Sequence, residues 1–183
     1  ENIIITGSTF LSLNTSKHLV DSLTSSFLIA FVVIFISMSF MFKSTKLAII
    51  SILPNLIPLI IAGGVMGYLG IKLRPSTAMT FSIALGIAVD DTIHFLSRFK
   101  YELINNNNDT DKALVNTLET SGQAIISTTI ILSLGFLVLT FSEFVPNHEF
   151  GILATIVLVS ALLTSMLLIP ALIYLIKPKI NNA

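Results

Sequence analysis

Two adjacent carboxylates, Asp90 and Asp91, follow a long uncharged stretch of the chain that runs from Pro75 to Val89. A charge near the centre of a bilayer costs about 2.5–3.5 kcal/mol on insertion scales, so an acidic pair is rare there unless it faces protein or water. Burial disfavours the ionised form of a carboxylate, and a neighbouring carboxylate disfavours that form further. One of the two could therefore take up and release a proton. The pair predicts ion or proton handling within a membrane.

His94 lies four residues after Asp90, on the same face if this stretch is helical. An imidazole exchanges protons near neutral pH, which suits a proton relay. His94 also lies four residues before Arg98, so it could instead be a satisfied polar residue near the membrane surface. No other His or Cys accompanies it at the spacing of metal ligands, so we expect no metal site. We predict a relay formed by Asp90, Asp91 and His94.

Five further residues are expected to support the acidic pair. Gly86 leaves room for a neighbouring helix or water, and Thr92 follows the pair directly. Asn55 lies between two prolines, which predicts a bent helix that either lines a transport site or only serves packing. Ser127 and Thr128 carry hydroxyls that could help to hold a proton at the pair if their helix faces it.

The acidic pair could instead be structural and neutralised by a Lys or Arg on another helix. No apolar stretch of spanning length in this chain contains an interior Lys or Arg. Such a partner would therefore have to come from outside the chain.

The composition is that of an integral membrane protein. Of the 183 residues, 54% are hydrophobic and only 11% are charged, against about 25% charged in soluble domains. The net charge is zero, so no basic character suggests a nucleic-acid partner. The absence of cysteine excludes disulfides and thiol chemistry. We expect an all-α membrane protein with membrane lipids as its surroundings.

Five stretches approach the length of about 20 residues that a helix needs to cross a bilayer. The third is acceptable only if the acidic pair and His94 lie inside it. Together the five predict a transmembrane domain over residues 22–177, with spans at about 22–42, 47–70, 75–97, 120–142 and 150–176.

Basic residues indicate the orientation, because they are enriched on the cytoplasmic side. One side would hold seven Lys and Arg residues and the other three. The seven are Lys43, Lys46, Arg98, Lys100, Lys112, Lys177 and Lys179, and the three are Lys17, Lys72 and Arg74. This distribution predicts an external N-terminal segment and a cytoplasmic C-terminus, with the inverted topology as the alternative.

The remaining segments are assigned by their polarity. Residues 1–21 are expected to be the last strand and linker of an external, periplasmic domain, in a chain that is a piece of a longer protein. Residues 98–119 form the cytoplasmic connection, with a turn at the Asn run and a short helix capped by Asp109 or Thr110. That helix could lie on the membrane surface or act as a solvated linker. Residues 178–183 form a cytoplasmic tail.

The acidic motif is similar to a known family pattern. Residues 86–96 read Gly-Ile-Ala-Val-Asp-Asp-Thr-Ile-His-Phe-Leu, and residues 53–58 read Leu-Pro-Asn-Leu-Ile-Pro. Over about residues 6–177 the chain resembles the resistance–nodulation–division (RND) superfamily, closest to the hydrophobe/amphiphile exporters and the MMPL-type lipid exporters. The Gly-x-x-x-Asp-Asp pattern is also shared with sterol-sensing-domain proteins.

This resemblance implies a five-helix bundle that forms one half of an RND-type transporter, in a bacterial inner membrane. It also implies that Asp90 and Asp91 carry the protons that drive export of a hydrophobic or amphiphilic substrate. The N-terminal half and the external domain of the same protein would then be required partners, and a homo-oligomer or an adaptor protein could complete the exporter. No cofactor other than the coupling proton is expected.

Two other classes compete with the exporter. A sterol-sensing or lipid-sensing regulatory domain would have the same spans without transport and could tolerate amides in place of the aspartates. An intramembrane enzyme is disfavoured, because an aspartyl dyad needs carboxylates that converge from different helices. We therefore expect that the chain is not an enzyme.

Overall fold

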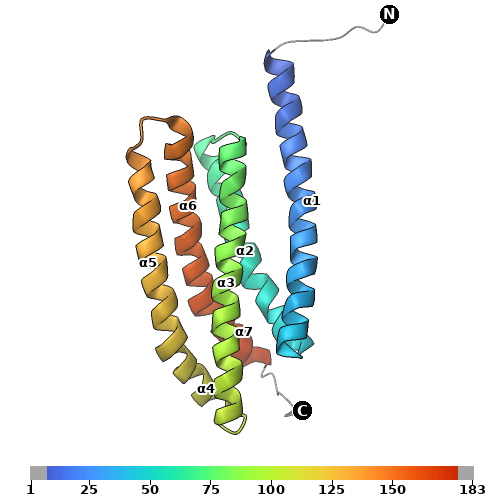
Figure 1. Ribbon diagram of the computed structural model, residues 1–183, viewed down its shortest axis with the longest axis vertical. Coiled ribbons are helices and arrows are strands. Elements are labelled where there is room, and N and C mark those ends of the chain that lie inside the picture. The colour runs from blue at the N-terminus through green and yellow to red at the C-terminus, as the bar shows by residue number, and fades with distance from the viewer. Residues whose placement is uncertain (1–7, 177–183) are drawn as a thin grey trace, which may run out of the picture.

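A computed structural model describes the backbone of residues 8–176, and the described part is almost entirely helical (Figure 1). No strand occurs in it. Five helices are long and apolar enough to cross a membrane, which confirms the predicted all-α bundle of five spans. They are His18–Phe42, Leu47–Leu69, Ser76–Asn105, Thr110–Phe141 and Val145–Ile176.

The first three spans are single helices: α1 (Ser8–Phe42), α2 (Thr45–Leu69) and α3 (Pro75–Asn105). The fourth is a rod of α4 (Thr110–Thr117), the π-helical turn η1 (Leu118–Gly122), α5 (Gln123–Val138) and the 3-10 turn η2 (Leu139–Phe141). The fifth is a rod of α6 (Val145–Leu163), the π-helical turn η3 (Thr164–Leu168) and α7 (Ile169–Ile176).

Helices α3 and α6 form the centre of the bundle. Each packs against the other and against α2, while α5 packs on the far side of α6 (Figure 1). Helix α1 stands apart from the other helices over much of its length and joins them at the end where it meets α2 (Figure 1). The acidic stretch of the sequence therefore lies on a central helix.

The connections follow the local chemistry of their residues. Helix α2 ends at Gly70, whose φ of +66° is a conformation that glycine adopts without a steric cost. The chain leaves α3 through Asn107 and Asn108 at φ 54° and 64°, a left-handed region that Asn tolerates well. Asp109 then caps α4, because its side chain accepts a hydrogen bond from the Lys112 amide. The turn at the Asn run and the cap at Asp109 are confirmed.

The strand predicted near the N-terminus is wrong for residues 8–21. These residues form the first part of α1, because no Gly or Pro interrupts the helix between Ser8 and Asp21. The rest of that prediction, residues 1–7, lies outside the described residues, as do residues 177–183.

Three predicted span boundaries also differ from the helices, and one of them is the start of the fourth span, at Thr110 rather than residue 120. Helix α3 continues to Asn105 instead of ending at residue 97, because Phe99 and Leu103 are fully buried and extend its packed face. Residues 98–119 are therefore mostly helix and not a free connection. The fifth span begins at Val145 rather than residue 150, with Pro146 in its first turn, where the missing amide hydrogen is not needed. Helix α4 buries Ala113 against the bundle, while Asp111 and Lys112 stay exposed.

Two apolar clusters hold the helices together. The larger lies where α1, α2, α3, α4, α5 and α7 meet, and the smaller joins the middle of α2, α3 and α6. Their fully buried members include Met38, Phe42, Leu47, Phe95, Leu96, Phe99, Leu103, Ile169 and Ile173 in the first, and Ala62 and Val157 in the second. Large apolar side chains such as Val33 on α1 and Leu134 on α5 remain exposed on the outer faces, as lipid contact requires.

Candidate functional site

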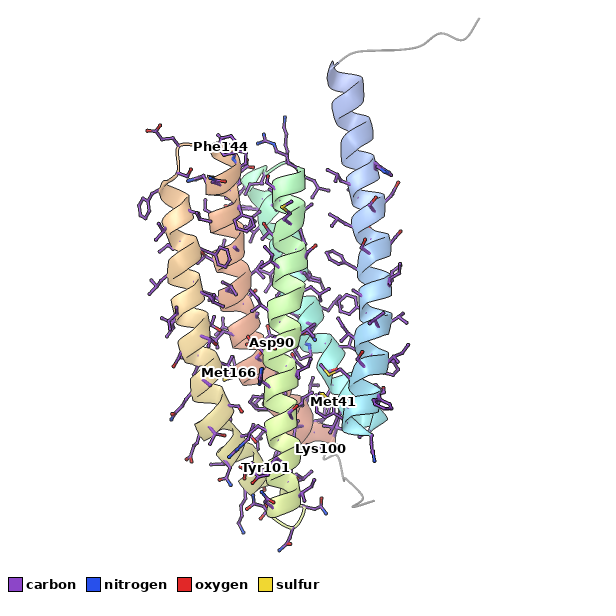
Figure 2. All side chains as sticks on the ribbon, in the orientation of Figure 1. Met41, Asp90, Lys100, Tyr101, Phe144 and Met166 are labelled. Atoms are coloured by element: carbon purple, nitrogen blue, oxygen red, sulfur yellow. The ribbon has the colours of Figure 1, made fainter. Side chains whose placement is uncertain are left out.

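The acidic pair lies midway along α3. Asp90 is 15 residues from Pro75 and 15 residues from Asn105, the two ends of that helix. The proline starts the helix, and the uncharged residues up to Val89 carry it into the bundle. Figure 2 shows Asp90 about halfway along the bundle. The pair is therefore far from both ends of the helix that carries it.

The two carboxylates have different surroundings. Successive residues of a helix point about 100° apart, and here that rotation separates the outside of the bundle from its interior. The Asp90 side chain is 69% exposed. Asp91 is only 8% exposed. The sequence predicted the divergence of the two side chains but not which of them faces inward.

Asp90 and His94 form the outward part of the predicted relay. Their side chains are both exposed, with His94 Nε2 3.5 Å from Asp90 Oδ1. Gly86, one turn earlier, is also exposed, and nothing lies within 4 Å of the place where a Cβ would be. The room that Gly86 was expected to leave is therefore present on this outer face.

Asp91 is buried without a partner for part of its carboxylate. Its Oδ2 accepts no hydrogen bond from any described residue. The basic side chains that form ion pairs in the described part of the chain pair elsewhere: Arg74 with Glu149, Arg98 with Glu102 and Lys112 with Asp109. A buried polar oxygen is costly unless water or another group satisfies it. The Asp91 carboxylate must therefore be protonated, hydrated by water, or paired with a group outside the described residues.

Thr92 connects the acidic helix to the bent helix α2. Its hydroxyl lies 3.1 Å from Asn55 Oδ1 and 2.8 Å from the Ala88 carbonyl oxygen. The Asn55 amide donates to the Ser51 carbonyl oxygen at 2.7 Å. Both Thr92 and Asn55 are fully buried. The structure thus brings together the two predicted supporting residues Thr92 and Asn55, next to the acidic pair.

Ser127 and Thr128 are not brought to the acidic pair. Both are exposed and donate to carbonyl oxygens of their own helix, Ser127 to Gln123 and Thr128 to Ala124 and Ile125. Helix α5 packs mainly on α6, so these hydroxyls point away from the bundle. The inward hydroxyl of this stretch belongs to Thr129, which is 3% exposed.

Comparison with known proteins identifies the family. The chain matches the sequence profile of the MMPL family over residues 2–179, which is nearly its whole length. The chain belongs to the MMPL family. This confirms the resemblance carried by the acidic motif.

Two proteins from different organisms are similar in sequence to this MMPL chain. It is 31% identical over 132 residues to a membrane protein of Methanocaldococcus jannaschii, a match that covers 72% of this chain and 34% of the relative. It is 30% identical over 118 residues to Protein patched homolog 1 of Caenorhabditis elegans, covering 63% of this chain and 8% of that protein. The chain therefore spans about a third or less of the curated relatives it matches.

A second polar cluster in the MMPL chain was not predicted. The Glu102 carboxylate, 7% exposed, lies 2.7 Å from Arg98 Nη2 and accepts a hydrogen bond from Asn116 Nδ2 at 3.0 Å. It thereby ties α3 to α4. Close by, Lys100 donates to the carbonyl oxygens of Met41 and Phe42 at the end of α1 (Figure 2). The spacing of Arg98 and Glu102 indicated an ion pair, but the partner on α4 is distant in sequence.

An apolar groove lies beside the acidic face. It has a volume of about 390 Å³ and runs between α1 and α3. Its lining includes Phe27, Ala30 and Ile34 from α1 and Leu85, Gly86 and Val89 from α3. The groove leads along α3 from Gly86 toward Asp90, one turn further on. An acyl chain or a flat apolar ring fits such a lining in size and chemistry.

Proposed function

We propose that this MMPL chain is the transmembrane half of an exporter of hydrophobic or amphiphilic molecules, driven by the proton gradient. Asp90 and Asp91 would be the proton-binding groups, with His94 as the relay partner of Asp90. The proton would be the coupling ion, and no cofactor, metal or enzymatic step would be involved. The protein would lie in a bacterial inner membrane with its C-terminus in the cytoplasm.

The burial of Asp91 carries this proposal. A carboxylate that is 8% exposed, with an unpaired oxygen at the middle of a membrane helix, is stable only if its charge can be neutralised. Reversible protonation neutralises it without a permanent partner. A protein that needed only structure at this position would be more stable with an apolar residue there.

Asp90 supports the proposal from the other side of the helix. A side chain that is 69% exposed at this depth cannot face lipid at an acceptable cost, so a further part of the protein must cover it. We expect the N-terminal half and external domain of the same protein to do so, with an oligomer or adaptor completing the export route. Protonation could then alter the contact between the halves and so couple to substrate movement.

Carbodiimide labelling of the full-length protein in membranes tests this function without knowledge of the substrate. The reagent modifies protonated carboxyl groups in apolar surroundings, and mass spectrometry locates the modified residue. We expect Asp91 to be modified at low pH and protected at high pH, because only the protonated form reacts. Asp91→Asn should abolish the signal, and Asp111→Asn, which removes an exposed carboxylate, should not change it. Absence of modification at every pH, or modification independent of pH, would refute the proposal.

A lipid-sensing domain without transport is the second candidate. The observation that favours it is the groove of about 390 Å³ between α1 and α3. In that function the aspartates would be dispensable and the groove would not. Asp90→Asn with Asp91→Asn in the full protein would then leave lipid binding and its regulatory output intact. Export that persists in this double variant would refute proton coupling through Asp90 and Asp91.

A further inference from the structure

Unpartnered polar atoms are concentrated along one seam of the bundle. Six buried side-chain nitrogen or oxygen atoms have no hydrogen-bond partner among the described residues. Five of them belong to residues on α3, α5 and α6: Thr80 Oγ1, Asp91 Oδ2, Arg98 Nε, Ser133 Oγ and Glu149 Oε2. Arg98 pairs with Glu102 nearer the end of α3, and the sixth atom, Ser39 Oγ, is on α1. Buried polar groups without protein partners are commonly satisfied by water.

A small pocket lies at the level of Thr80 in this seam. It has a volume of about 10 Å³, close to the minimum that holds one water molecule. Thr80 and Ile87 of α3 line it together with Phe136 of α5 and Val157 of α6. The unpaired Thr80 hydroxyl is therefore next to a space that one water molecule could fill.

At the level of Phe95, further along α3, the seam ends in packed apolar residues. Phe95 of α3, Ile125 of α5 and Ile169 of α7 belong to one buried cluster. Asp91 lies one turn from Ile87 and one turn from Phe95, on the same face of α3 as both. Asp91 therefore faces the seam between the pocket and this cluster.

Helix α5 presents two hydroxyls between the same two levels. Thr129, Ser133 and Phe136 are spaced by four and three residues, so they share a face of the helix. Phe136 lines the pocket, and Ile125, one turn before Thr129, lies in the cluster. The hydroxyls of Thr129 and Ser133 thus lie between the level of the pocket and the level of the cluster, about one helical turn, or about 5 Å, from each other.

The outer end of the seam carries an ion pair. Glu149, in the second turn of α6, lies 3.6 Å from Arg74 at the start of α3. Its side chain is 15% exposed, and the Oε2 atom of this pair has no hydrogen bond. A carboxylate at the mouth of a buried path can collect protons from the adjacent water.

Few other titratable groups face Asp91. On α3, Asp90 and His94 are turned outward, and Arg98, two turns further on, is paired with Glu102. Between Leu47 and Leu69 of α2 the one titratable side chain is Tyr68, which is exposed, and α5 has none. From Phe150 to Ile176 the fifth span has only Tyr174, which is also exposed. No fixed charge in these stretches therefore holds Asp91 in one protonation state.

We infer that the seam between α3, α5 and α6 is a proton entry path that runs from Glu149 through water held by Thr80 and Ser133 to Asp91. In each step a water molecule gives a proton to the next water or hydroxyl and receives one from behind. At the end an O–H bond forms on Asp91 Oδ2 and the carboxylate becomes a neutral acid. Thr80 and Ser133 are positioning residues. The inference rests on the proposed function, because it assumes that Asp91 is reversibly protonated.

Protonation kinetics in the full-length protein test the path. Infrared difference spectroscopy after a pH jump follows the carbonyl band of the protonated carboxyl group, and Asp91→Asn assigns that band. We expect Thr80→Val and Ser133→Ala each to slow the rise of the band by about tenfold, with the final amplitude unchanged. Removing an unpaired buried hydroxyl should leave thermal stability equal or higher, so a slower rise would not reflect misfolding.

Two variants sharpen the outcome. Ser39→Ala removes another unpaired buried hydroxyl, on α1 and away from the seam, and should leave the rate as in the wild type. Thr80→Ser keeps the hydroxyl and should restore the rate lost in Thr80→Val. Rates equal to the wild type in both Thr80→Val and Ser133→Ala, or equal slowing by Ser39→Ala, would overturn the path alone. Absence of the Asp91 band in the wild type at every pH would overturn the proposed function as well.

Discussion

Asp90 and Asp91 are identical side chains that one step along a helix places in different surroundings. Asp91 is 8% exposed and lies inside the bundle, whereas the Asp90 side chain is 69% exposed on its outer face. The sequence predicted that the two side chains diverge, because this follows from helix geometry. Which member faces inward depends on how α2 and α6 pack on α3, and those contacts are distant in sequence.

The hydrogen bond between Thr92 and Asn55 should be measurable as stability. Thr92→Val removes the hydroxyl and leaves Asn55 Oδ1, which now accepts at 3.1 Å, without a donor inside the bundle. Polar contacts between membrane helices contribute about 0.6 kcal/mol on average and up to about 1.7 kcal/mol. We expect a loss of about 1 kcal/mol in the free energy of unfolding in mixed micelles. Thr128→Val, which removes an exposed hydroxyl bonded only to its own helix, is the matched control and should cost less. Equal costs for the two variants would contradict an interhelical role.

The cap at Asp109 should make the start of α4 sensitive to pH. The backbone amide and the side chain of Lys112 hydrogen-bond to its carboxylate and hold its pKa below the usual range. A carboxyl group with a lowered pKa in the folded state stabilises that state above its unfolded pKa, and the contribution is lost as pH falls through the folded pKa. We expect the Lys112 amide resonance in an NMR titration to move with a midpoint below the usual Asp value of about 3.9. Asp109→Asn keeps a good cap without a titrating group and should remove the shift. A midpoint at or above about 3.9 would contradict the cap.

At the scale of elements, the sequence predicted where spans end better than where they begin, with the end of α3 as the exception. Uncharged length located all five helices, because the bilayer imposes that length. The end of α3 was misplaced because Arg98 and Lys100 suggested a membrane boundary, while the helix continues by burying Phe99 and Leu103 against the bundle. The length of an apolar stretch predicts how much of a helix contacts lipid. The extension of α3 depends instead on its contacts with other helices.

Glu102 should be the residue that fastens α4 to α3. Its carboxylate is bonded to Arg98 on its own helix and to Asn116 on α4. Glu102→Gln keeps the size but loses the charge and one acceptor oxygen. We expect the amides of Thr110–Thr117 to exchange hydrogen about tenfold faster, the effect of losing about 1.4 kcal/mol. Glu119→Gln, the same change at an exposed position on η1, is the control. Equal exchange in both variants would show that apolar packing of Ala113 alone holds α4.

At the scale of the whole molecule, the bundle presents an incomplete outer face. Asp90, His94 and Gly86 are exposed on the side where α1 and α3 border the apolar groove. The sequence indicated a missing partner through the absence of an interior Lys or Arg in the spans, and this stays a prediction. The groove itself could not be predicted, because it depends on the separation of α1 from α3 (Figure 1).

The orientation of the bundle can be tested because the chain contains no cysteine, so single-cysteine variants have no background within it. The turn between α3 and α4 and the turn between α5 and α6 lie at opposite ends of the bundle (Figure 1). Asn105→Cys and Glu143→Cys place exposed thiols at these two ends. Because basic residues gather at the end of Asn105, we expect that end to be cytoplasmic. A membrane-impermeant maleimide should therefore label Glu143→Cys in intact cells and label Asn105→Cys only after permeabilisation. The reverse pattern would establish the inverted topology, and with it proton entry at Glu149 from the cytoplasmic side.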